Sequence, residues 1–203
     1  MVRHGPIYIW MINAMKRVFW LAFLGTAVVA AAQSTTWKID PNHSASQFSV
    51  KHLGISTVRG VFQKTTGTVI YDVADPRKTQ IDATIDAASV DTRVERRDND
   101  LRGPNFLDVT KYPTITFKST HVEPAGTGKM KVTGDLTIRG VTKQVVLDVD
   151  GPSAPVSAMG GQRMGAEAST TINRKDFGVN GAPSMVGDQI QIVLDVEMTA
   201  GGK

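Results

Sequence analysis

The chain has 203 residues, of which 23 are Lys or Arg and 19 are Asp or Glu, and its formal net charge is +4. Three of the basic residues and none of the acidic ones lie in the first 32 residues, so the rest of the chain is close to neutral and lacks the basic surplus of a nucleic-acid-binding domain. The absence of cysteine excludes disulfides, thiol catalysis and cysteine-based metal sites.

The first 32 residues have the layout of a secretory signal peptide. Lys16 and Arg17 form a short basic segment, residues 18–29 are apolar, and small residues follow up to Ala32. This apolar run is shorter than the roughly 20 residues of a membrane-spanning helix, although a retained N-terminal anchor is the alternative. We therefore expect cleavage after Ala32 and a periplasmic or secreted protein. A start at Met15 would give a more ordinary leader.

The remainder, residues 33–203, is expected to form one domain made mostly of β-strands. Apolar and polar residues alternate, as they do in strands with one buried face, at residues 47–52, 81–87, 114–118, 130–139, 164–172 and 190–198. Turn-forming pairs separate these runs, and residues 151–161 are interpreted as one long loop. The pattern favours a sandwich or a barrel, and we predict a single antiparallel up-and-down β-barrel of about eight strands, because closure leaves no free sheet edge.

One segment breaks the alternation and predicts a short α-helix between two strands. Thr92 and Glu95 have the spacing of a capping box, and Gly103 follows as a stop signal. About three turns would fit between them, with Val94 and Leu101 on one face because they are seven residues apart. We expect this helix near the mouth of the barrel.

The inward face of such a barrel can be predicted from the parity of each strand. The expected ligand contacts from strands are Phe48, Val50, Ile85, Phe117, Met130, Val132, Leu136, Ile172, Ile192 and Leu194, some of which would be plain core below a cavity. His52 shares the parity of Phe48 and Val50. A hydrogen-bonded residue of the barrel wall is its first interpretation, and contact with a ligand head group is its second.

Two loop residues, Phe106 and Phe177, complete the set of expected ligand contacts. Phe177 lies in residues 173–178, which are interpreted equally well as a functional loop and as a tight turn with Phe177 packed as an apolar plug. Aromatic residues make up only 6% of the chain, and many inward positions are small. Small lining residues favour a cavity over a barrel filled by side chains.

No catalytic or metal motif is present in the sequence. Residues 126–129 predict a hairpin turn, because the upstream glycine spacing of a phosphate loop is missing. The histidines His43, His52 and His121 lack metal-ligand spacing, although a site assembled by the fold stays open. The adjacent Arg97 and Asp98 are expected to form a structural ion pair with the sheet. We therefore predict no catalytic residue, no metal and no cofactor.

The chain resembles the YceI-like family over nearly all of residues 33–203. The resemblance is carried by IDPNHS at 39–44, FxVKHLGI at 48–55, VRG at 58–60, RDxxLR at 97–102, FLD at 106–108, KYP at 111–113, GDLTIRGVTK at 134–143, INRxDFG at 172–178 and GD at 187–188. The family usually has a histidine just before the leucine of its helix motif, where this chain has Asp100. Any role of that histidine cannot be transferred to this chain.

This resemblance implies a lipocalin-like barrel that binds polyisoprenoids. The expected function is therefore that of a carrier for an isoprenoid lipid or an isoprenoid quinone, with contact to a membrane and a homodimer left open. One alternative is an envelope stress-related module without a ligand. The less favoured alternative is an enzyme that modifies an isoprenoid lipid, for which His52, Asp100 and Arg97 are loose candidates.

Overall fold

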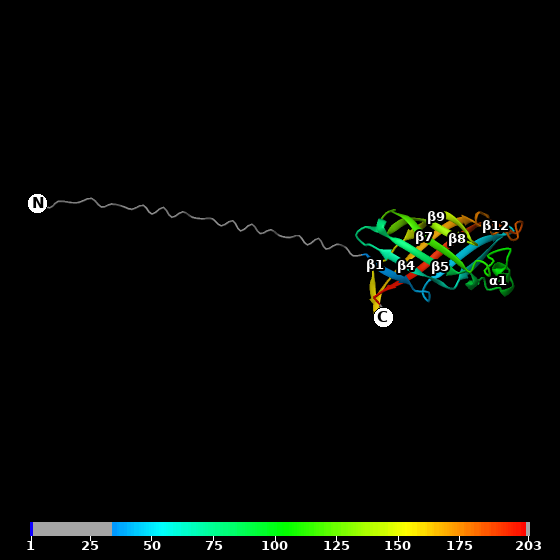
Figure 1. Ribbon diagram of the computed structural model, residues 1–203, viewed down its shortest axis with the longest axis horizontal. Helices are drawn as coiled ribbons and strands as arrows, with labels where there is room; N and C mark the ends of the chain where they lie inside the picture. Colours follow the sequence, from blue (N-terminus) through cyan, green and yellow to red (C-terminus); the bar gives the residue numbers. More distant parts are fainter. Residues whose placement is uncertain (2–33, 202–203) are drawn as a thin grey trace. The chain divides into compact units, whose positions relative to one another are not determined.

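Twelve β-strands and one α-helix make up the part of the chain that the computed structural model describes, which is Met1 and residues 34–201 (Figure 1). The predicted leader falls on residues outside this part, Met1 excepted. The strands are β1 Thr35–Ile39, β2 Ala45–His52, β3 Ser56–Phe62, β4 Thr65–Tyr71, β5 Gln80–Asp86, β6 Val90–Asp91, β7 Thr114–Pro124, β8 Lys129–Ile138, β9 Val141–Asp150, β10 Val156–Ala158, β11 Gly161–Asn173 and β12 Val186–Ala200. The helix is α1 Glu95–Arg102, and single 3₁₀ turns lie at η1 Pro76–Lys78, η2 Ala87–Ser89 and η3 Arg174–Phe177.

The strands close into an antiparallel ring in the order β1-β4-β5-β7-β8-β9-β11-β12. The pairing of β11 with β12 closes it, in an unbroken register from Gln162 opposite Ala200 to Asn173 opposite Gln189. The hairpin of β2 and β3 extends the wall, because β2 pairs with the first part of β12 and β1 pairs with its end. The predicted eight-stranded, up-and-down barrel is thus confirmed.

The junction between β1 and β2 keeps both strands on β12. The Asp40 carboxylate accepts a hydrogen bond from the backbone N–H of Asn42 at 3.0 Å, which makes a tight turn. After the turn, the Ser44 hydroxyl exchanges hydrogen bonds with the backbone of Glu197, at 3.3 Å to its carbonyl and 3.0 Å from its N–H. A polar segment therefore connects two strands without opening the ring.

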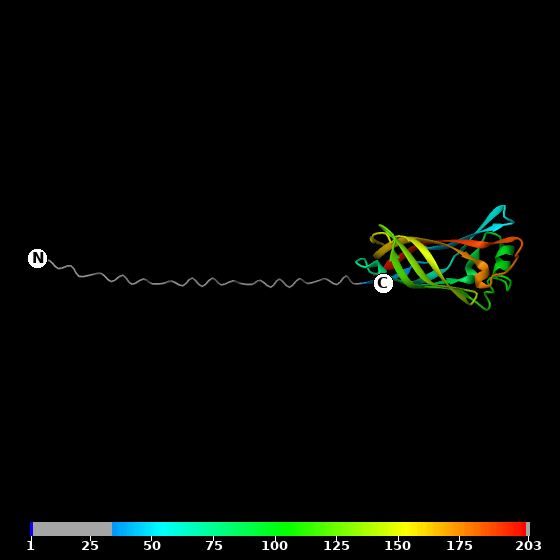
Figure 2. The same cartoon turned by 90° about the horizontal axis from the view of Figure 1, so that it is seen from above.

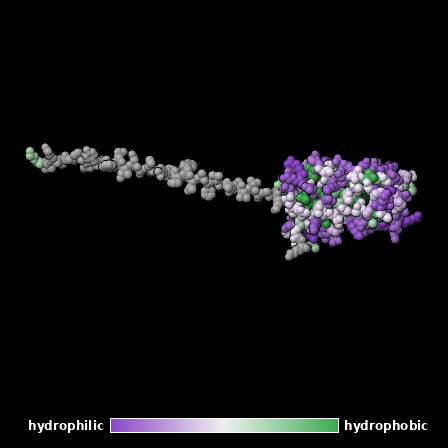
Figure 3. Space-filling view, in the orientation of Figure 1, coloured by the Kyte–Doolittle hydropathy of each residue, from purple (hydrophilic) through white to green (hydrophobic). Residues whose placement is uncertain are grey.

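The alternation that predicted the strands also builds the core. In β8 the buried residues occupy every second position from Met130 to Ile138, and the residues between them are exposed or half-buried. Two clusters of buried apolar side chains result, a larger one that includes Phe117 and Phe177 and a smaller one around Trp37. In Figure 3, hydrophilic and near-neutral residues cover most of the visible face, with a few hydrophobic residues scattered among them.

The helix is shorter than predicted and begins differently. It has eight residues, its N-cap is Val94, and no side chain caps it, so the predicted capping box of Thr92 and Glu95 is wrong. Val94 lies outside the helix and is 46% exposed, so it shares no buried face with Leu101. The helix does lie at one end of the barrel, as Figures 1 and 2 show. No helix among the described residues has the length and apolar character to span a membrane.

Two further expectations are corrected by the structure. Arg97 and Asp98 form no ion pair with the sheet among the described residues; both bind Thr92, Arg97 through its guanidinium and Asp98 through its carboxylate. Residues 151–161 are not one long loop, because β10 forms a hairpin with β11 in which Ala158 is opposite Gly161. The hairpin turn expected at residues 126–129 is present between β7 and β8.

Candidate functional site

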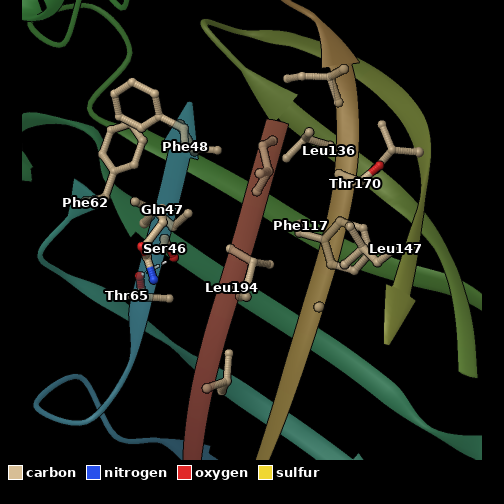
Figure 4. A pocket seen from close by; sticks show the side chains of 18 of the residues that line it. Ser46, Gln47, Phe48, Phe62, Thr65, Phe117, Leu136, Leu147, Thr170 and Leu194 are labelled. Carbon is tan, nitrogen blue, oxygen red and sulfur yellow. Dashed lines mark hydrogen bonds between the residues drawn. The ribbon is translucent and has the colours of Figure 1, made fainter. Parts of the chain in front are cut away.

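A cavity of about 260 Å³ lies inside the ring of strands. It is lined almost wholly by apolar side chains, and it reaches from Leu101 of α1 and Phe106 at one end to Met164 and Met198 at the other. Figure 4 shows side chains from several strands converging on this space. An apolar cavity of about 150 Å³ already holds a benzene ring, so this one has room for a larger apolar molecule.

Most of the ligand contacts predicted from the sequence line this cavity. They are Phe48, Val50, Ile85, Phe106, Phe117, Met130, Leu136, Ile172, Phe177, Ile192 and Leu194. For those on strands, the meeting at one cavity follows from parity, because every second residue of each strand faces the interior of a closed barrel. A role of these residues in binding stays a prediction.

Val132 does not line the cavity, although it has the inward parity of β8. The register of β7 and β8 shifts between Ser119 and His121, and this irregularity brings Val122 opposite Val132. Both valines are almost completely inaccessible, at 1% and 0% exposed. They fill the wall at this position, so Val132 belongs to the packed core.

His52 is also absent from the cavity lining. It is opposite Val186 in β12, whereas Val50 is opposite Ile190, so the pairing slips between these two positions. Alternation along a strand no longer predicts which residues face inward beyond such an irregularity. His52 is half-buried at the end of β2, and its contact with a ligand head group stays a prediction.

Strand β9 contributes three lining residues that are not among the contacts predicted from the sequence. Val145, Leu147 and Val149 of β9 reach the cavity, and they alternate with polar or more exposed neighbours. The period of two was therefore available in the sequence to identify them. Phe62 was also missed; it packs on Phe48, with ring centroids 5.6 Å apart.

The turn at residues 173–178 closes the barrel at the end where α1 lies. The Asn173 side chain caps η3, Gly178 takes the left-handed conformation, and Phe177 is 2% exposed, so the interpretation as a tight turn with a packed Phe177 is confirmed. The Arg174 guanidinium is buried beside it. It donates hydrogen bonds to four backbone carbonyls, those of Val179, Gly181, Val186 and Gly187, at 2.7–2.9 Å.

A cluster of charged groups lies at the junction of β1 and β2. Asp40, His43 and Glu197 bring three potential metal-ligand atoms within 4.8 Å of one another. The Arg163 guanidinium binds both carboxylates, at 3.0 Å from Asp40, and so already compensates their charge. Hydrogen bonds from His43, from the Asn42 backbone and from Arg163 lower the pKa of Asp40 to about 2. The arrangement is that of an ion-paired structural junction.

The loose candidates for catalysis do not meet in the barrel. His52, Arg97 and Asp100 are all absent from the cavity lining, and Asp100 is exposed. Among the residues that do line it in the described part of the chain, only Tyr71 and Arg174 are ionisable. The cavity wall therefore offers shape and apolar surface for a ligand.

Comparison with known proteins gives consistent matches. The model of the YceI-like domain matches residues 37–198. A UPF0312 protein of Ectopseudomonas mendocina is 34% identical over 186 residues, which is 90% of this chain and 97% of the relative. The crystal structure of Burkholderia cenocepacia BcnA has a TM-score of 0.68 and 28% identity, and the match covers 78% of this chain and 98% of that one.

A structure described as a polyisoprenoid binding domain from Saccharophagus degradans is also similar. Its TM-score is 0.61 at 16% identity, and the match covers 83% of this chain and all (100%) of that one. At this identity, the likeness shows a shared fold.

Proposed function

Since the chain belongs to the YceI-like family, we propose that it is a binding protein that holds a long-chain isoprenoid lipid, or a similar amphiphile, inside its barrel. The observation that carries this proposal is the apolar cavity of about 260 Å³, which runs from the Leu101 end to the Met164 end of the ring. A fold shared with a domain described as polyisoprenoid-binding supports it. Binding is favoured over catalysis because the wall supplies apolar surface and little ionisable chemistry.

The length of the ligand can be argued from transfer energies. Burial of one CH₂ group stabilises a complex by roughly 0.8 kcal/mol, so about ten groups give about 8 kcal/mol. Association costs about 4–15 kcal/mol in lost freedom, so a short apolar chain would bind poorly. A long polyprenyl chain, including the tail of an isoprenoid quinone, contributes enough buried surface. Such contacts have no direction, so chains of different identity should compete for the cavity.

The experiment that tests this proposal is native mass spectrometry of protein purified from its natural host, followed by organic extraction. A polyprenyl species released in near-equal amount to the protein would support the carrier function. In a second arm, ligand-free protein is titrated with polyprenyl chains from roughly C10 to roughly C40, and affinity should rise with length until the cavity is full. Equal affinity across the series, or no uptake at all, would instead favour the module without a ligand.

The place of action follows from the leader predicted by the sequence. An exported carrier would work in the periplasm or outside the cell, and fractionation of cells that carry a tagged full-length chain tests this. Retention of the tag in the cytosolic fraction would contradict export.

A carrier of this kind would have to exchange its ligand with a membrane, and one surface fits that role. Leu53, Ile55 and Met185 are 54%, 83% and 49% exposed, and the Leu53 N–H donates to the Met185 carbonyl at 2.7 Å. The exposed Lys51 and Arg59 lie beside them on the β2–β3 hairpin and suit anionic lipid. Replacement of Leu53 and Ile55 by serine should weaken flotation with anionic vesicles, and unchanged flotation would remove this surface from the proposal.

A further inference from the structure

Two hydroxyl groups form a hydrogen-bonded pair in the wall of the cavity, most of which is apolar. Ser46 of β2 and Thr65 of β4 both line the cavity, and their side-chain oxygens are 2.7 Å apart. Both residues are buried, at 3% and 5% exposed. Figure 4 shows the pair on one wall of the pocket, on the same side as Phe48 and Phe62.

The backbone fixes where this pair lies. Ser46 is opposite Phe62 in β3 and Leu194 in β12, and Thr65 is opposite Ile85 in β5. These partners line the same cavity. Each hydroxyl is near the start of its strand, just after the breaks that separate β1 from β2 and β3 from β4. The pair is therefore held by rigid strands between the Leu101 end and the Met164 end of the cavity.

A pair of hydroxyl groups has two protons, and their mutual hydrogen bond uses only one of them. Within residues 34–201, neither side-chain oxygen makes a second hydrogen bond. One O–H group is therefore left as a donor at the surface of the cavity. A buried donor without an acceptor is unfavourable, so a ligand oxygen placed here would gain a hydrogen bond in a medium of low polarity.

The charge of the cavity wall restricts which oxygen can bind. Arg174 is the one cationic residue among the described residues that line the cavity. Its guanidinium is occupied by four backbone carbonyls and lies 3.5 Å from Asp188. A carboxylate or a phosphate inside the barrel would consequently have no free counter-charge, and burial of an unpaired anion is strongly unfavourable.

We propose that the Ser46–Thr65 pair is a polar subsite that donates a hydrogen bond to an uncharged oxygen acceptor, such as a carbonyl or an ether, of a ligand held inside the barrel. This inference rests on the proposed binding function and refines its ligand class. The ligand is then an apolar chain that carries a neutral acceptor at the depth of the pair. Any charged group of the same molecule stays outside the cavity.

The test compares a long-chain ketone with the alkane of the same length. Affinities are measured by competition in native mass spectrometry for the wild type and for the double variant Ser46→Ala, Thr65→Val, which keeps the shape of the wall. The ketone should bind the wild type about tenfold more tightly, as one hydrogen bond of about 1.4 kcal/mol gives. In the double variant this ratio should fall to about one.

A matched control removes the same groups from the outer face of the same strands. Ser49 and Thr66 lie on β2 and β4 with the opposite parity to Ser46 and Thr65, and neither lines the cavity. The variant Ser49→Ala, Thr66→Val should keep the tenfold preference for the ketone. Loss of the preference in this control would overturn the assignment to the inner pair.

The remaining outcomes separate this inference from the proposed function. Equal binding of ketone and alkane by the wild type overturns the subsite and leaves lipid binding intact, whereas failure of both probes to bind overturns both. Tighter binding of the carboxylate of the same length overturns the restriction to neutral acceptors. Should the double variant fail to fold, the infrared carbonyl band of the ketone bound to the wild type decides: a shift to lower frequency than in hexadecane supports the hydrogen bond, and an unshifted band overturns it.

Discussion

At the scale of single residues, Gly134 of β8 lies where the packing leaves no room for a methyl group. A Cβ atom built there would be 2.4 Å from the Phe117 ring and 2.6 Å from the carbonyl oxygen of Lys118. The backbone oxygen cannot move away as the end of a flexible side chain could. Phe117 lines the cavity, and the missing side chain of Gly134 leaves room for its ring.

We expect Gly134→Ala to lower the free energy of unfolding by about 1–3 kcal/mol, the usual cost of an overpacked site. The control is Gly165→Ala on β11, where the nearest atom would be 3.5 Å away, at an ordinary contact distance. There the lost backbone freedom of the unfolded chain should leave stability unchanged or slightly higher. Urea denaturation of both variants measures the difference, and equal midpoints would contradict the packing argument.

The charged junction of Asp40, His43 and Arg163 predicts a dependence of stability on pH. The pKa of Asp40 is lowered to about 2 in the folded protein from an ordinary value of 3.8, first by the hydrogen bond with His43. A carboxylate with a lowered pKa stabilises the folded state above its unfolded pKa, and this contribution is lost as the pH falls through the folded value. Asp40 therefore contributes fully at neutral pH and loses its contribution between about pH 4 and about pH 2.

The variant Asp40→Asn removes this titrating group. It should be less stable than the wild type at neutral pH, and the difference should shrink as the pH is lowered toward about 2. Free energies of unfolding measured in urea at a series of pH values test this. A difference that stays constant down to acidic pH would show that the junction acts through packing alone.

At the scale of elements, α1 is attached to the barrel by the residue that the sequence suggested as its cap. The N–H and the hydroxyl of Thr92 both donate to the Asp98 carboxylate, at 2.9 and 2.5 Å, and Asp98 is 5% exposed. The sequence identifies a hydroxyl near a helix start, but a local pattern does not contain its partner in the folded chain. The bonds therefore tie α1 back to the end of β6.

We expect Asp98→Ala to destabilise the protein by about 2–3 kcal/mol, because hydrogen bonds to a charged group are lost and the Thr92 donors stay buried. Asp100→Ala in the same helix is the control, since Asp100 is exposed, and its effect should stay within about 0.5 kcal/mol. Hydrogen exchange should show faster opening of residues 95–102 in the first variant. Equal exchange in both variants would show that other contacts hold the helix.

At the scale of the whole molecule, a period of two was sufficient to predict the barrel but not the boundary between cavity and core. The alternation in each strand predicts which residues face inward, and about eight strands are enough for the sheet to close into a barrel. Val132, which is core, and Leu136, which lines the cavity, have the same parity on β8, and a shift of register against the neighbouring β7 lies between them. The position of His52 depends on a similar shift against β12. Both cases involve pairing between strands, which the pattern of a single strand does not contain.

The same limit applies to the Ser46–Thr65 pair. The two residues are 19 positions apart, and nothing in either strand's pattern predicts that their hydroxyls meet. They come together because β2 pairs with β12, and β1 pairs with both β12 and β4. The sequence therefore predicts an apolar interior, whereas the pairing of these two hydroxyls can be recognised only in the closed fold.

A cavity and a filled core predict opposite results for one substitution, which gives a test at the scale of the whole barrel. Ala166 of β11 lines the cavity and is only partly buried. A leucine there would enter empty space, so Ala166→Leu should stabilise the ligand-free protein by up to about 2 kcal/mol, about 0.8 kcal/mol for each added CH₂ group. In a filled interior, it would instead destabilise the protein by about 1–3 kcal/mol.

The same leucine should weaken the binding of long chains more than that of short ones. It shortens the space open to a ligand, while the cavity wall stays apolar. Unfolding in urea and competition between two chain lengths measure the two effects, with Ala158→Leu on the exposed β10 as the control. A gain in the stability of the ligand-free protein, together with a lost preference for the longer chain, would show that the interior is empty and that ligands bind in it. A loss of stability with an unchanged preference would contradict the cavity itself, and with it the carrier function.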